Sequence, residues 1–519
     1  MNRLCVAIFA ALFLIGTTQS AFAQDVTLTS RDGKVEINGN ILGFDGDFYR
    51  VETKFGELTI DGSGVLCDGP GCPNLTSFVA EVVFSGSSTM AEVLLPSLVE
   101  GFAARNGLSV RRETLDDTQF EYILSDATTD AIVARFAFAV SNTDKGFADL
   151  LANEADVVLA LREIRPEERN RAYEAGMGDM TGRNRARVLA LDAMVPVVAQ
   201  DNPVRRISTP LLAQVFAGRV TNWQDLGGPD APISLHLPAL GSGLAQAVED
   251  RLLKPSKLPL AAEITRYDRS SSLARAVMND PFAIGLASYA ETGTARVLTL
   301  TGECGFSLAA TRRSIKTEDY PLTSPMFLYL PARRLPKLAR EFLSYTNTPA
   351  AQSVIRQSGF VDQEPEQIGL NVQGDRLANA IRAAGKEVPI EELQRMITLL
   401  EPMQRLTTSF RFEVGSTRPD AQSRANVTLL ASALEEGRYD GRRLVFVGFS
   451  DGDGPAAGNQ KIALKRANAV KDAVLELAET AGLERIEIQV AAFGEAMPMA
   501  CDDSDWGRQA NRRVEVWVR

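Results

Sequence analysis

The feature that most constrains this chain lies between about residues 77 and 363, where strand-like segments alternate with amphipathic segments of helical period. Strands that alternate with helices pack as α/β structures, in which the helices flank a sheet. The whole chain has 519 residues. At roughly 150 residues per domain, about three domains with separate cores are expected.

Composition and charge exclude several classes of partner. Apolar residues make up 45% and charged residues 23% of the chain, as in ordinary globular proteins. The formal net charge is −11 and the isoelectric point lies near 5.0. An acidic protein of this kind is not expected to bind nucleic acid or an anionic membrane surface through its overall field. Any small anion must therefore be held by local geometry.

The first residues have the three parts of a secretory signal. A basic Arg3 precedes an apolar run, and Ala21-Phe22-Ala23 forms a cleavage site of the A-x-A type. Residues 1–23 are therefore predicted to be a signal peptide, and the mature protein to be exported. Beyond them there is no run of about 18 apolar residues, so no transmembrane helix is expected.

Export to an oxidising compartment favours disulfides over free thiols. Cys67 and Cys72 flank a Pro/Gly-rich turn in CDGPGC and are predicted to form a local disulfide. Cys304 and Cys501 fall in different predicted domains, so their pairing stays open. Paired CxxC spacing is absent, and neither a metal nor another cofactor is expected.

The chain is expected to be multidomain, with α/β and α+β parts. Between the α/β region and the α+β unit we expect a helical connector, made of two helices with a break between them near Val388-Pro389. The expected ranges are 1–23 for the signal peptide, 24–76 for a small β module, 77–365 for the α/β region, 366–405 for the helical connector and 406–519 for a compact α+β unit.

Three glycine and serine loops in the α/β region lead into helical segments. Helix N-termini offer unpaired N–H groups and positive dipole ends, so converging loops could hold an oxyanion without a metal. Each loop taken alone is equally consistent with ordinary helix capping. The loops are SGSSTM at 85–90, SNTDKG at 141–146 and GSG at 241–243.

The order of segments here resembles the phosphate-binding proteins of ABC importers, which are periplasmic solute-binding proteins. FSGSSTM, ADVVLALREI and LDAMVPVVAQDNPVRRISTPLLAQVFAGRVTNWQDLGG carry the resemblance, which spans roughly 280 residues. It implies two α/β lobes that close by a hinge, a small phosphate-like oxyanion as ligand and an ABC permease as partner. The anion contacts that it implies are Ser87, Ser88, Thr89, Ser141, Arg162, Ser242 and Gly243.

Three residues depart from that family's pattern. Pro238 stands where an arginine is usual, Leu244 replaces a threonine, and Leu161 replaces a serine or aspartate. Losing a bidentate arginine removes about 1.5–3 kcal/mol of binding. Phosphate specificity is therefore open, and a scaffold without a small ligand stays an alternative.

Near the carboxyl end, LVFVGFSDGDG at 444–454 contains the G-x-S-x-G pattern of a hydrolase nucleophile elbow. A nucleophilic Ser450 would need a histidine base after it in the chain. The sequence has one histidine, His236, which lies far upstream in another predicted domain. A nucleophile elbow at Ser450 is therefore not supported, and Asp451 becomes the candidate functional residue of this segment.

Asp451 has a possible partner fifteen residues on, in Arg466. That arginine lies in a helical segment with an apolar stripe, so a loop carboxylate and a helix guanidinium could face one pocket. Such a pair can clamp a zwitterion, the carboxylate taking an ammonium group and the guanidinium a carboxylate. A surface salt bridge is the alternative.

Residues 405–519 resemble the OmpA-like peptidoglycan-binding domain. SFRFEVGSTRPDAQ, VGFSDGDGPAAGNQKIALKRANAV and FGEAMPMACDDSDWGRQANRRVEVWV carry the resemblance, with Phe449, Ser450 and Ala463 as departures. It implies that Asp451 and Arg466 bind the two ends of diaminopimelate in the wall peptide. It also implies that Asn459 shapes the loop while Asn511 and Arg513 support the site.

Together these expectations describe an exported, non-enzymatic binding protein, tethered to peptidoglycan in the periplasm at the inner face of the outer membrane. One alternative is an envelope adaptor whose solute-binding fold has lost its small ligand. A second alternative is an enzyme that uses the cleft between the lobes. The sequence shows no nucleophile paired with a general base, which argues against it.

Overall fold

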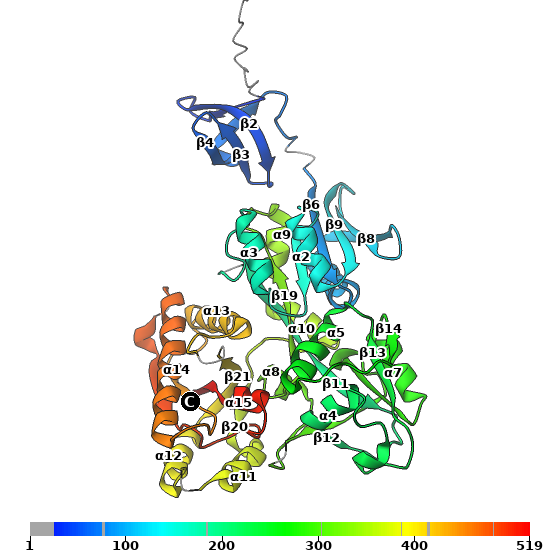
Figure 1. Ribbon diagram of the computed structural model, residues 1–519. Helices are drawn as coiled ribbons and strands as arrows, with labels where there is room; N and C mark the ends of the chain where they lie inside the picture. Colours follow the sequence, from blue (N-terminus) through cyan, green and yellow to red (C-terminus); the bar gives the residue numbers. More distant parts are fainter. Residues whose placement is uncertain are drawn as a thin grey trace, which may run out of the picture. The chain divides into compact units, whose positions relative to one another are not determined.

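The computed structural model describes residues 25–74, 78–182, 185–302, 304–385, 387–412, 416–480 and 482–519. The signal peptide predicted for residues 1–23 lies outside these ranges. The chain forms two compact units, residues 1–78 and 79–519 (Figure 1). No helix in the described ranges is long and apolar enough to span a bilayer.

The first unit is a small antiparallel β module, as the alternating segments KVEIN, FYRVE and GELTI predict. Val26, Leu28, Tyr49 and Val51 form its core. The predicted disulfide between Cys67 and Cys72 is present. The strands pair in the order β4-β3-β2-β1-β5 and comprise β1 (Val26–Ser30), β2 (Glu36–Phe44), β3 (Phe48–Thr53), β4 (Gly56–Asp61) and β5 (Val65–Asp68).

The second unit begins with two α/β lobes that share the long strand β11. The first half of β11 (Ala186–Val198) pairs with β19 (Thr323–Tyr329), and its second half pairs with β15 (Ala283–Ser288). β11 thus runs from one lobe into the other. The sequence of β11 is a nearly continuous apolar run, and its residues are buried almost throughout. Both features are expected for a strand that is covered on both faces of the sheet.

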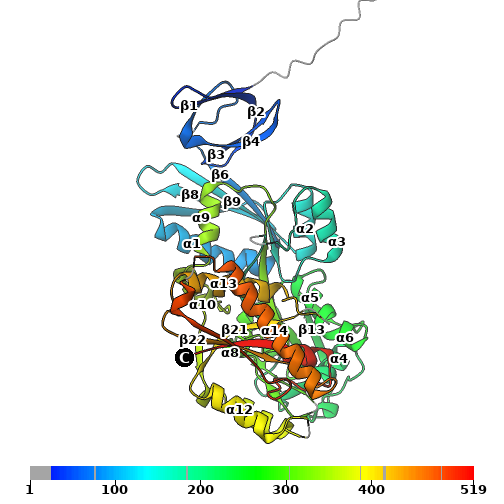
Figure 2. The ribbon, with the colours of Figure 1, turned by 90° about the vertical axis from the view of Figure 1, so that its left-hand side faces the viewer.

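The other strands of the lobes extend this sheet, except β12, β17 and β18, which form a small sheet of their own, and helices flank the strands (Figures 1 and 2). In the first lobe they are β6 (Ala80–Ser87), η2 (Met90–Leu94), α1 (Leu95–Arg105), β7 (Leu108–Thr114), β8 (Gln119–Asp126), β9 (Ile132–Ser141), α2 (Thr143–Leu151), β10 (Val157–Ala160), α3 (Pro166–Glu174), α9 (Lys337–Tyr345) and α10 (Pro349–Gln357). In the second lobe and its border they are β12 (Arg206–Ser208), α4 (Thr209–Phe216), η3 (Trp223–Leu226), β13 (Ser234–Pro238), α5 (Gly243–Val248), η4 (Glu249–Leu253), α6 (Lys254–Ser256), β14 (Thr265–Tyr267), α7 (Ser270–Met278), η5 (Tyr289–Glu291), β16 (Arg296–Val297), β17 (Thr299–Thr301), β18 (Ser307–Leu308) and α8 (Arg312–Lys316).

The carboxyl-terminal module is a mixed sheet with helices on both faces. Its strands pair in the order β20-β21-β24-β22-β23. Its elements are β20 (Gln367–Gly369), η6 (Leu370–Val372), α11 (Gly374–Ala383), α12 (Ile390–Leu400), β21 (Gln404–Arg411), α13 (Ala421–Glu435), β22 (Arg443–Phe449), α14 (Ala456–Leu477), η7 (Leu483–Arg485), β23 (Glu487–Ala492), α15 (Asp505–Asn511) and β24 (Arg513–Val518).

Successive side chains of β22 point to opposite faces of the sheet, so each face of the sheet has its own hydrophobic core. Leu444 and Phe446 face the core shared with α13 and α14. Val445, Val447 and Phe449 face the core shared with α11 and α12. The two helices predicted as a connector, interrupted around Pro389, are therefore the covering layer of one face of the sheet.

Buried charges join the carboxyl-terminal module to the lobes. Asp319, which precedes β19, accepts bonds from Arg405 at 2.8 Å and from Arg411 at 3.0 Å, both on β21. Within the carboxyl-terminal module, Glu515 on β24 pairs with Arg513 at 2.7 Å and with Arg376 at 2.5 Å, and it lies 3.4 Å from Arg405, which connects it to Asp319. These carboxylates are almost completely buried. Burial alone would raise the pKa of Glu515, but the surrounding guanidinium groups lower it to about 2.

A disulfide crosses the same boundary. Cys304 follows β17 in the second lobe, and Cys501 lies just before α15 in the carboxyl-terminal module; the two are bonded. The sequence left this pairing open because the two cysteines fall in different predicted domains; they are 197 positions apart in the chain.

The buried network predicts a pH-dependent stability. Replacing Glu515 with Gln leaves buried arginines without their carboxylate and should lower the free energy of unfolding by about 3–5 kcal/mol at pH 7. Because the folded pKa of Glu515 is depressed, its contribution is present above pH 4.5 and is lost as the pH falls towards 2. Thermal unfolding at pH 7 and pH 3 measures both effects. The difference in the free energy of unfolding between wild type and variant should be smaller at pH 3 than at pH 7. Exposed Glu476→Gln is the control, and a gap of equal size at both pH values would contradict the assignment.

The inter-module disulfide predicts a second stability difference. The double variant Cys304→Ser/Cys501→Ser should lose about 2–5 kcal/mol in denaturant unfolding, because the link restrains a long loop in the unfolded chain. The matched variant Cys67→Ser/Cys72→Ser opens a short loop in the other unit. It should leave unfolding of the lobes and the carboxyl-terminal module unchanged. Identical midpoints for the first variant and wild type would show that the link is not formed.

Candidate functional site

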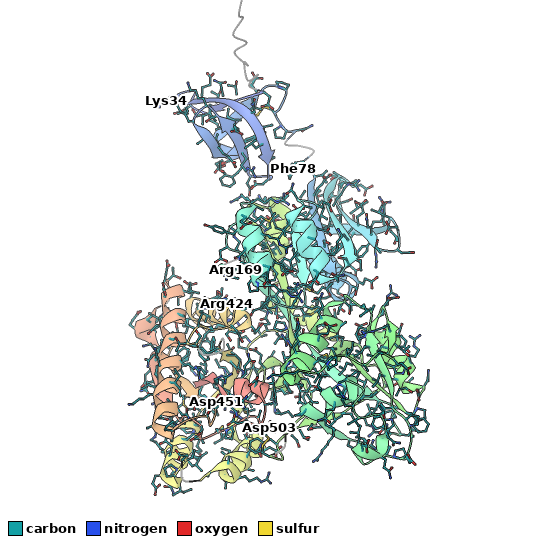
Figure 3. The ribbon with its side chains drawn as sticks, viewed as in Figure 1. Lys34, Phe78, Arg169, Arg424, Asp451 and Asp503 are labelled. Carbon is teal, nitrogen blue, oxygen red and sulfur yellow. A yellow bond between two sulfur atoms is a disulfide. The ribbon has the colours of Figure 1, made fainter. Side chains whose placement is uncertain are left out.

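Asp451 lies two residues beyond the carboxyl end of β22, an inner strand of the carboxyl-terminal sheet (Figure 3). Its side chain is largely buried, and its Oδ2 accepts a hydrogen bond from Arg512 Nη1 at 2.6 Å. The next backbone N–H, that of Gly452, donates to Asp502 Oδ2 at 2.8 Å. Asp451 Oδ1 makes no hydrogen bond with the part of the chain that the structure describes. One oxygen of this carboxylate is thus left for a ligand.

Arg466, on α14, lies within electrostatic range of Asp451 and Arg512. It is 4% exposed, and its contacts are two long hydrogen bonds of 3.5 Å to the carbonyl oxygen of Ser416 and the ring of Phe412 at 5.2 Å. Burial lowers the pKa of Arg466, and the nearby Arg512 lowers it further, while Asp451 raises it. Within the described ranges this buried guanidinium has no carboxylate in contact. Since buried charges are normally paired, Arg466 has unused capacity for an anionic group.

Three further residues named from the sequence hold this site in place. Asn511 accepts from the backbone N–H groups of Met499 and Ala500 and donates to Asp502 Oδ1, so it fixes the loop beside Asp451. Arg513 donates to the carbonyl oxygen of Met497 and lies 4.2 Å from the ring of Phe449.

Asn459, in the first turns of α14, reaches Glu495 Oε2 at 3.3 Å and the carbonyl oxygen of Gly454 at 3.4 Å. It thereby closes the loop that follows Asp451. Of the five residues predicted for the wall-binding site, Asp451 and Asn459 thus belong to or contact the loop after β22, while Asn511 and Arg513 bond the segment 497–502 and Arg466 bonds Ser416.

Arg512 and Asp502 are the site residues that sequence reasoning missed. The run Asn511-Arg512-Arg513 offered two adjacent arginines, and neighbouring residues at the end of a helix point in different directions. Arg513 lies under the site and Arg512 in it. The sequence alone does not show which of the two faces the carboxylate.

The hydrolase alternative finds no support in the geometry. Ser450 is 2% exposed, so its hydroxyl is not presented to a substrate. His236 lies on β13 in the second lobe, bonded through Nδ1 to the hydroxyl of Tyr267 at 2.9 Å. Burial lowers the pKa of His236. The serine and the histidine belong to different modules.

The three loops proposed for an oxyanion converge between the lobes. Ser87 at the end of β6 pairs with Ser141 at the end of β9. A side chain at Gly241 would meet the amide nitrogen of Asn142 at 3.3 Å, so the loop before α5 reaches the loop before α2. Ser88 and Thr89 lead from β6 into η2.

Arg162 lies where these loops meet, but its guanidinium group is already paired with other residues of the chain. It is bonded to Asp144, to Glu168 at 2.7 Å and to Gln246 Oε1 at 3.3 Å. Gln246, on α5, also donates to Asp144 Oδ2 at 2.7 Å. Burial opposes the charge of Arg162, but the bonds to the two carboxylates raise its pKa above the ordinary value. Two carboxylates therefore neutralise the cation expected to hold the anion.

Other residues of the loops also have structural partners. The Ser242 hydroxyl caps α5 by accepting from the N–H of Ala245. A Cβ atom at Gly243 would lie 2.8 Å from that of Leu161, so a leucine side chain fills the space beside this turn. Ser141 Oγ makes a long contact of 3.5 Å with the carbonyl oxygen of Asn142.

Comparison with known families agrees with both sequence resemblances. Residues 74–349 match the model of the PBP superfamily domain, and residues 411–512 match the model of the OmpA family. The two-lobed fold and the OmpA-like module expected from the sequence are therefore confirmed.

Curated relatives match the same two regions. Protein SphX of Synechococcus elongatus is 24% identical over 265 residues, which cover 48% of this chain and 76% of SphX. The phosphate-binding protein PstS of Staphylococcus haemolyticus is 24% identical over 230 residues, or 43% of this chain and 70% of PstS. Outer membrane porin F of Pseudomonas aeruginosa is 31% identical over 114 residues, or 22% of this chain and 31% of the porin.

Solved structures are similar at lower identity. An ABC-type phosphate transport receptor from Vibrio cholerae covers 54% of this chain over 99% of its own length, with 18% identity and a TM-score of 0.41. The peptidoglycan-associated lipoprotein from Burkholderia pseudomallei covers 22% of this chain over 90% of its own length, with 24% identity and a TM-score of 0.19. By the family-model matches, the chain belongs to the PBP superfamily, and residues 411–512 of its carboxyl-terminal module match the OmpA family.

Proposed function

We propose that this protein is an exported, non-enzymatic binding protein that holds peptidoglycan non-covalently by clamping diaminopimelate between Asp451 and Arg466. The observation that carries the proposal is the buried Arg466, which faces Asp451 and has no carboxylate in contact within the described ranges. Diaminopimelate has an ammonium group and a carboxylate on one carbon, which such a pair can hold together. The protein would then reside in the periplasm, attached to the wall at the inner face of the outer membrane.

Arg512 sets the geometry of this clamp. It holds Asp451 Oδ2, which orients the carboxylate and leaves Oδ1 to accept from the ligand's ammonium group. The ligand's carboxylate would then meet Arg466, whose hydrogen bonds to Ser416 are long and easily exchanged. Asn511 and Arg513 keep the loop in position beneath the ligand.

Retention on insoluble peptidoglycan tests the clamp. Asp451→Asn and Arg466→Gln should each weaken binding by at least about tenfold, because each removes a charge-assisted contact of about 1.5–3 kcal/mol. The controls are Asp453→Asn in the same loop and Lys465→Gln beside Arg466, both exposed charges. Equal retention of the two site variants and wild type would refute the clamp.

A second candidate function is the binding of a small oxyanion between the lobes, with delivery to an ABC permease. The names of several relatives as phosphate-binding proteins support it, as do the converging loops of Ser87, Ser88 and Thr89. The pairing of Arg162 with Asp144 and Glu168 supports instead the alternative of an envelope adaptor without a small ligand. Because Arg162 is neutralised, we expect wild-type phosphate binding to be weak.

Isothermal titration with inorganic phosphate separates these two possibilities. Asp144→Asn removes one carboxylate from Arg162 and should tighten phosphate binding by about tenfold, the value of one charge-assisted contact. Exposed Asp201→Asn is the control for the loss of one negative charge. Tight binding by wild type, unchanged in Asp144→Asn, would contradict the neutralisation of Arg162. No binding by either protein would leave the adaptor as the function of the lobes.

A further inference from the structure

The carboxyl-terminal module is fastened to both lobes of the second unit. In two-lobed binding folds the lobes close on a ligand by moving about the segments that connect them. Here β11 pairs with β19 in its first half and with β15 of the second lobe in its second half. Rotation of the lobes must therefore take place about β11 and its neighbours, and a body attached to both lobes opposes it.

The first attachment is made at the start of α13. Glu163, which follows β10 of the first lobe, accepts a hydrogen bond from the backbone N–H of Ala421 at 2.8 Å. Ala421 is 5% exposed and belongs to the hydrophobic core of the lobes, where α13 packs against β11. Its neighbour Gln422 donates to Gln363, which in turn donates to the carbonyl oxygen of Val188 on β11. The start of α13 is thus attached to the first lobe and to the shared strand.

The second attachment is made by the segment that leads into α15. Cys501 is bonded to Cys304 of the second lobe, and its sulfur also accepts from the N–H of Cys304 at 3.1 Å. A Cβ atom at Gly302 would lie 2.3 Å from the sulfur of Cys501, so the two segments pass with no room for a side chain between them. Trp506 of α15 and Pro210 of α4 line the same small gap. The segment is therefore held to the second lobe by a covalent bond and by close packing.

Between these two attachments the module is one packed body. The backbone N–H of Arg411 on β21 donates to the hydroxyl of Ser423 in α13 at 2.7 Å. The side chain of Arg411 donates to the carbonyl oxygen of Ala510 in α15 at 2.7 Å and to Asp319, just before β19, at 3.0 Å. One residue thus joins α13, α15 and the lobes. Because Arg411 is 4% exposed, a shift of the module against the lobes would leave a buried charge uncompensated.

Ion pairs between the lobes themselves are too weak to fix their angle. Arg269 of the second lobe lies 3.0 Å from Glu92 of the first, and Arg165 of the first lobe lies 3.6 Å from Asp250 of the second. The side chain of Arg269 is 64% exposed, and exposed ion pairs contribute only about 0–1 kcal/mol each. The contacts that run through the carboxyl-terminal module are buried or covalent, so they limit rotation more strongly.

We propose that the carboxyl-terminal module braces the two lobes at one fixed angle, with Ala421 as its attachment to the first lobe and the Cys304–Cys501 disulfide as its covalent attachment to the second. Rotation about β11 would have to break one of these attachments or deform the packed module between them. The lobes then form a rigid platform and not a receptor that opens and closes. This inference goes beyond wall binding, and it holds whether or not the proposed clamp binds diaminopimelate.

The brace has a consequence for the second candidate function. A ligand shifts an equilibrium between two conformations only by the difference in its affinity for them. Where the module excludes the open form, an anion that enters the cleft has no open form to close. Inorganic phosphate should therefore leave the angle between the lobes of wild type unchanged, whatever its affinity.

Distances between the lobes, measured by pulsed electron paramagnetic resonance on the full mature chain, test the brace. Spin labels are carried by noncanonical amino acids in place of Ala104 on α1 and Arg275 on α7, which are exposed on different lobes. Wild type should give one narrow distribution of distances, the same with and without inorganic phosphate. Cys304→Ser/Cys501→Ser should give a broader distribution with a second population, because the second lobe can then rotate.

The matched control is Cys67→Ser/Cys72→Ser, which opens a disulfide of the other unit and should keep the narrow wild-type distribution. A wild-type distribution that is broad, or that shifts when phosphate is added, would overturn the brace. That measurement needs no cysteine variant, so it stands even where Cys304→Ser/Cys501→Ser does not fold. A narrow distribution in that variant would likewise count against the proposal, because the disulfide would then not be what holds the second lobe.

Discussion

The arrangement of this protein depends on the buried contact between Asp319 and the two arginines of β21. Arg405 and Arg411 come from the first strand that follows the covering helices of the carboxyl-terminal module, and Asp319 comes from the lobes. A buried carboxylate is tolerated when guanidinium groups surround it, and a displaced partner would leave uncompensated charge. Such a contact specifies one relative placement of the two modules, because small shifts break its hydrogen bonds.

That placement brings the functional regions together. Glu163, the neighbour of Arg162 in the lobe cleft, accepts a hydrogen bond from the N–H of Ala421 at the start of α13. On the other side, Cys501 is bonded to Cys304 of the second lobe and precedes Asp502, which accepts a hydrogen bond from the loop of the proposed wall-binding site. Both candidate sites therefore have a covalent or hydrogen-bonded connection across the boundary between the modules.

Local patterns predicted the elements and the main pair of charges, because these depend on neighbours in sequence. Alternation along β22 separates its two faces, and the spacing of Asp451 and Arg466 places a loop end beside a helix face. The disulfide of Cys304, the pairing of Arg162 and the position of Arg512 depend on residues far away in the chain. Periodic patterns in the sequence carry no information about such long-range contacts, so these three contacts could be identified only from the packing of the modules.

Arg162 and Arg466 show how the environment of a buried arginine separates two roles. Both are largely buried, and both were proposed from sequence as ligands for an anion. Two carboxylates of the chain surround Arg162, so the free energy of its burial is already offset within the protein. Arg466 has a carbonyl oxygen at 3.5 Å and a ring instead, so its charge is still available. The same residue type is thus neutralised in the cleft and left without a carboxylate beside Asp451, and the proposed wall binding rests on this difference.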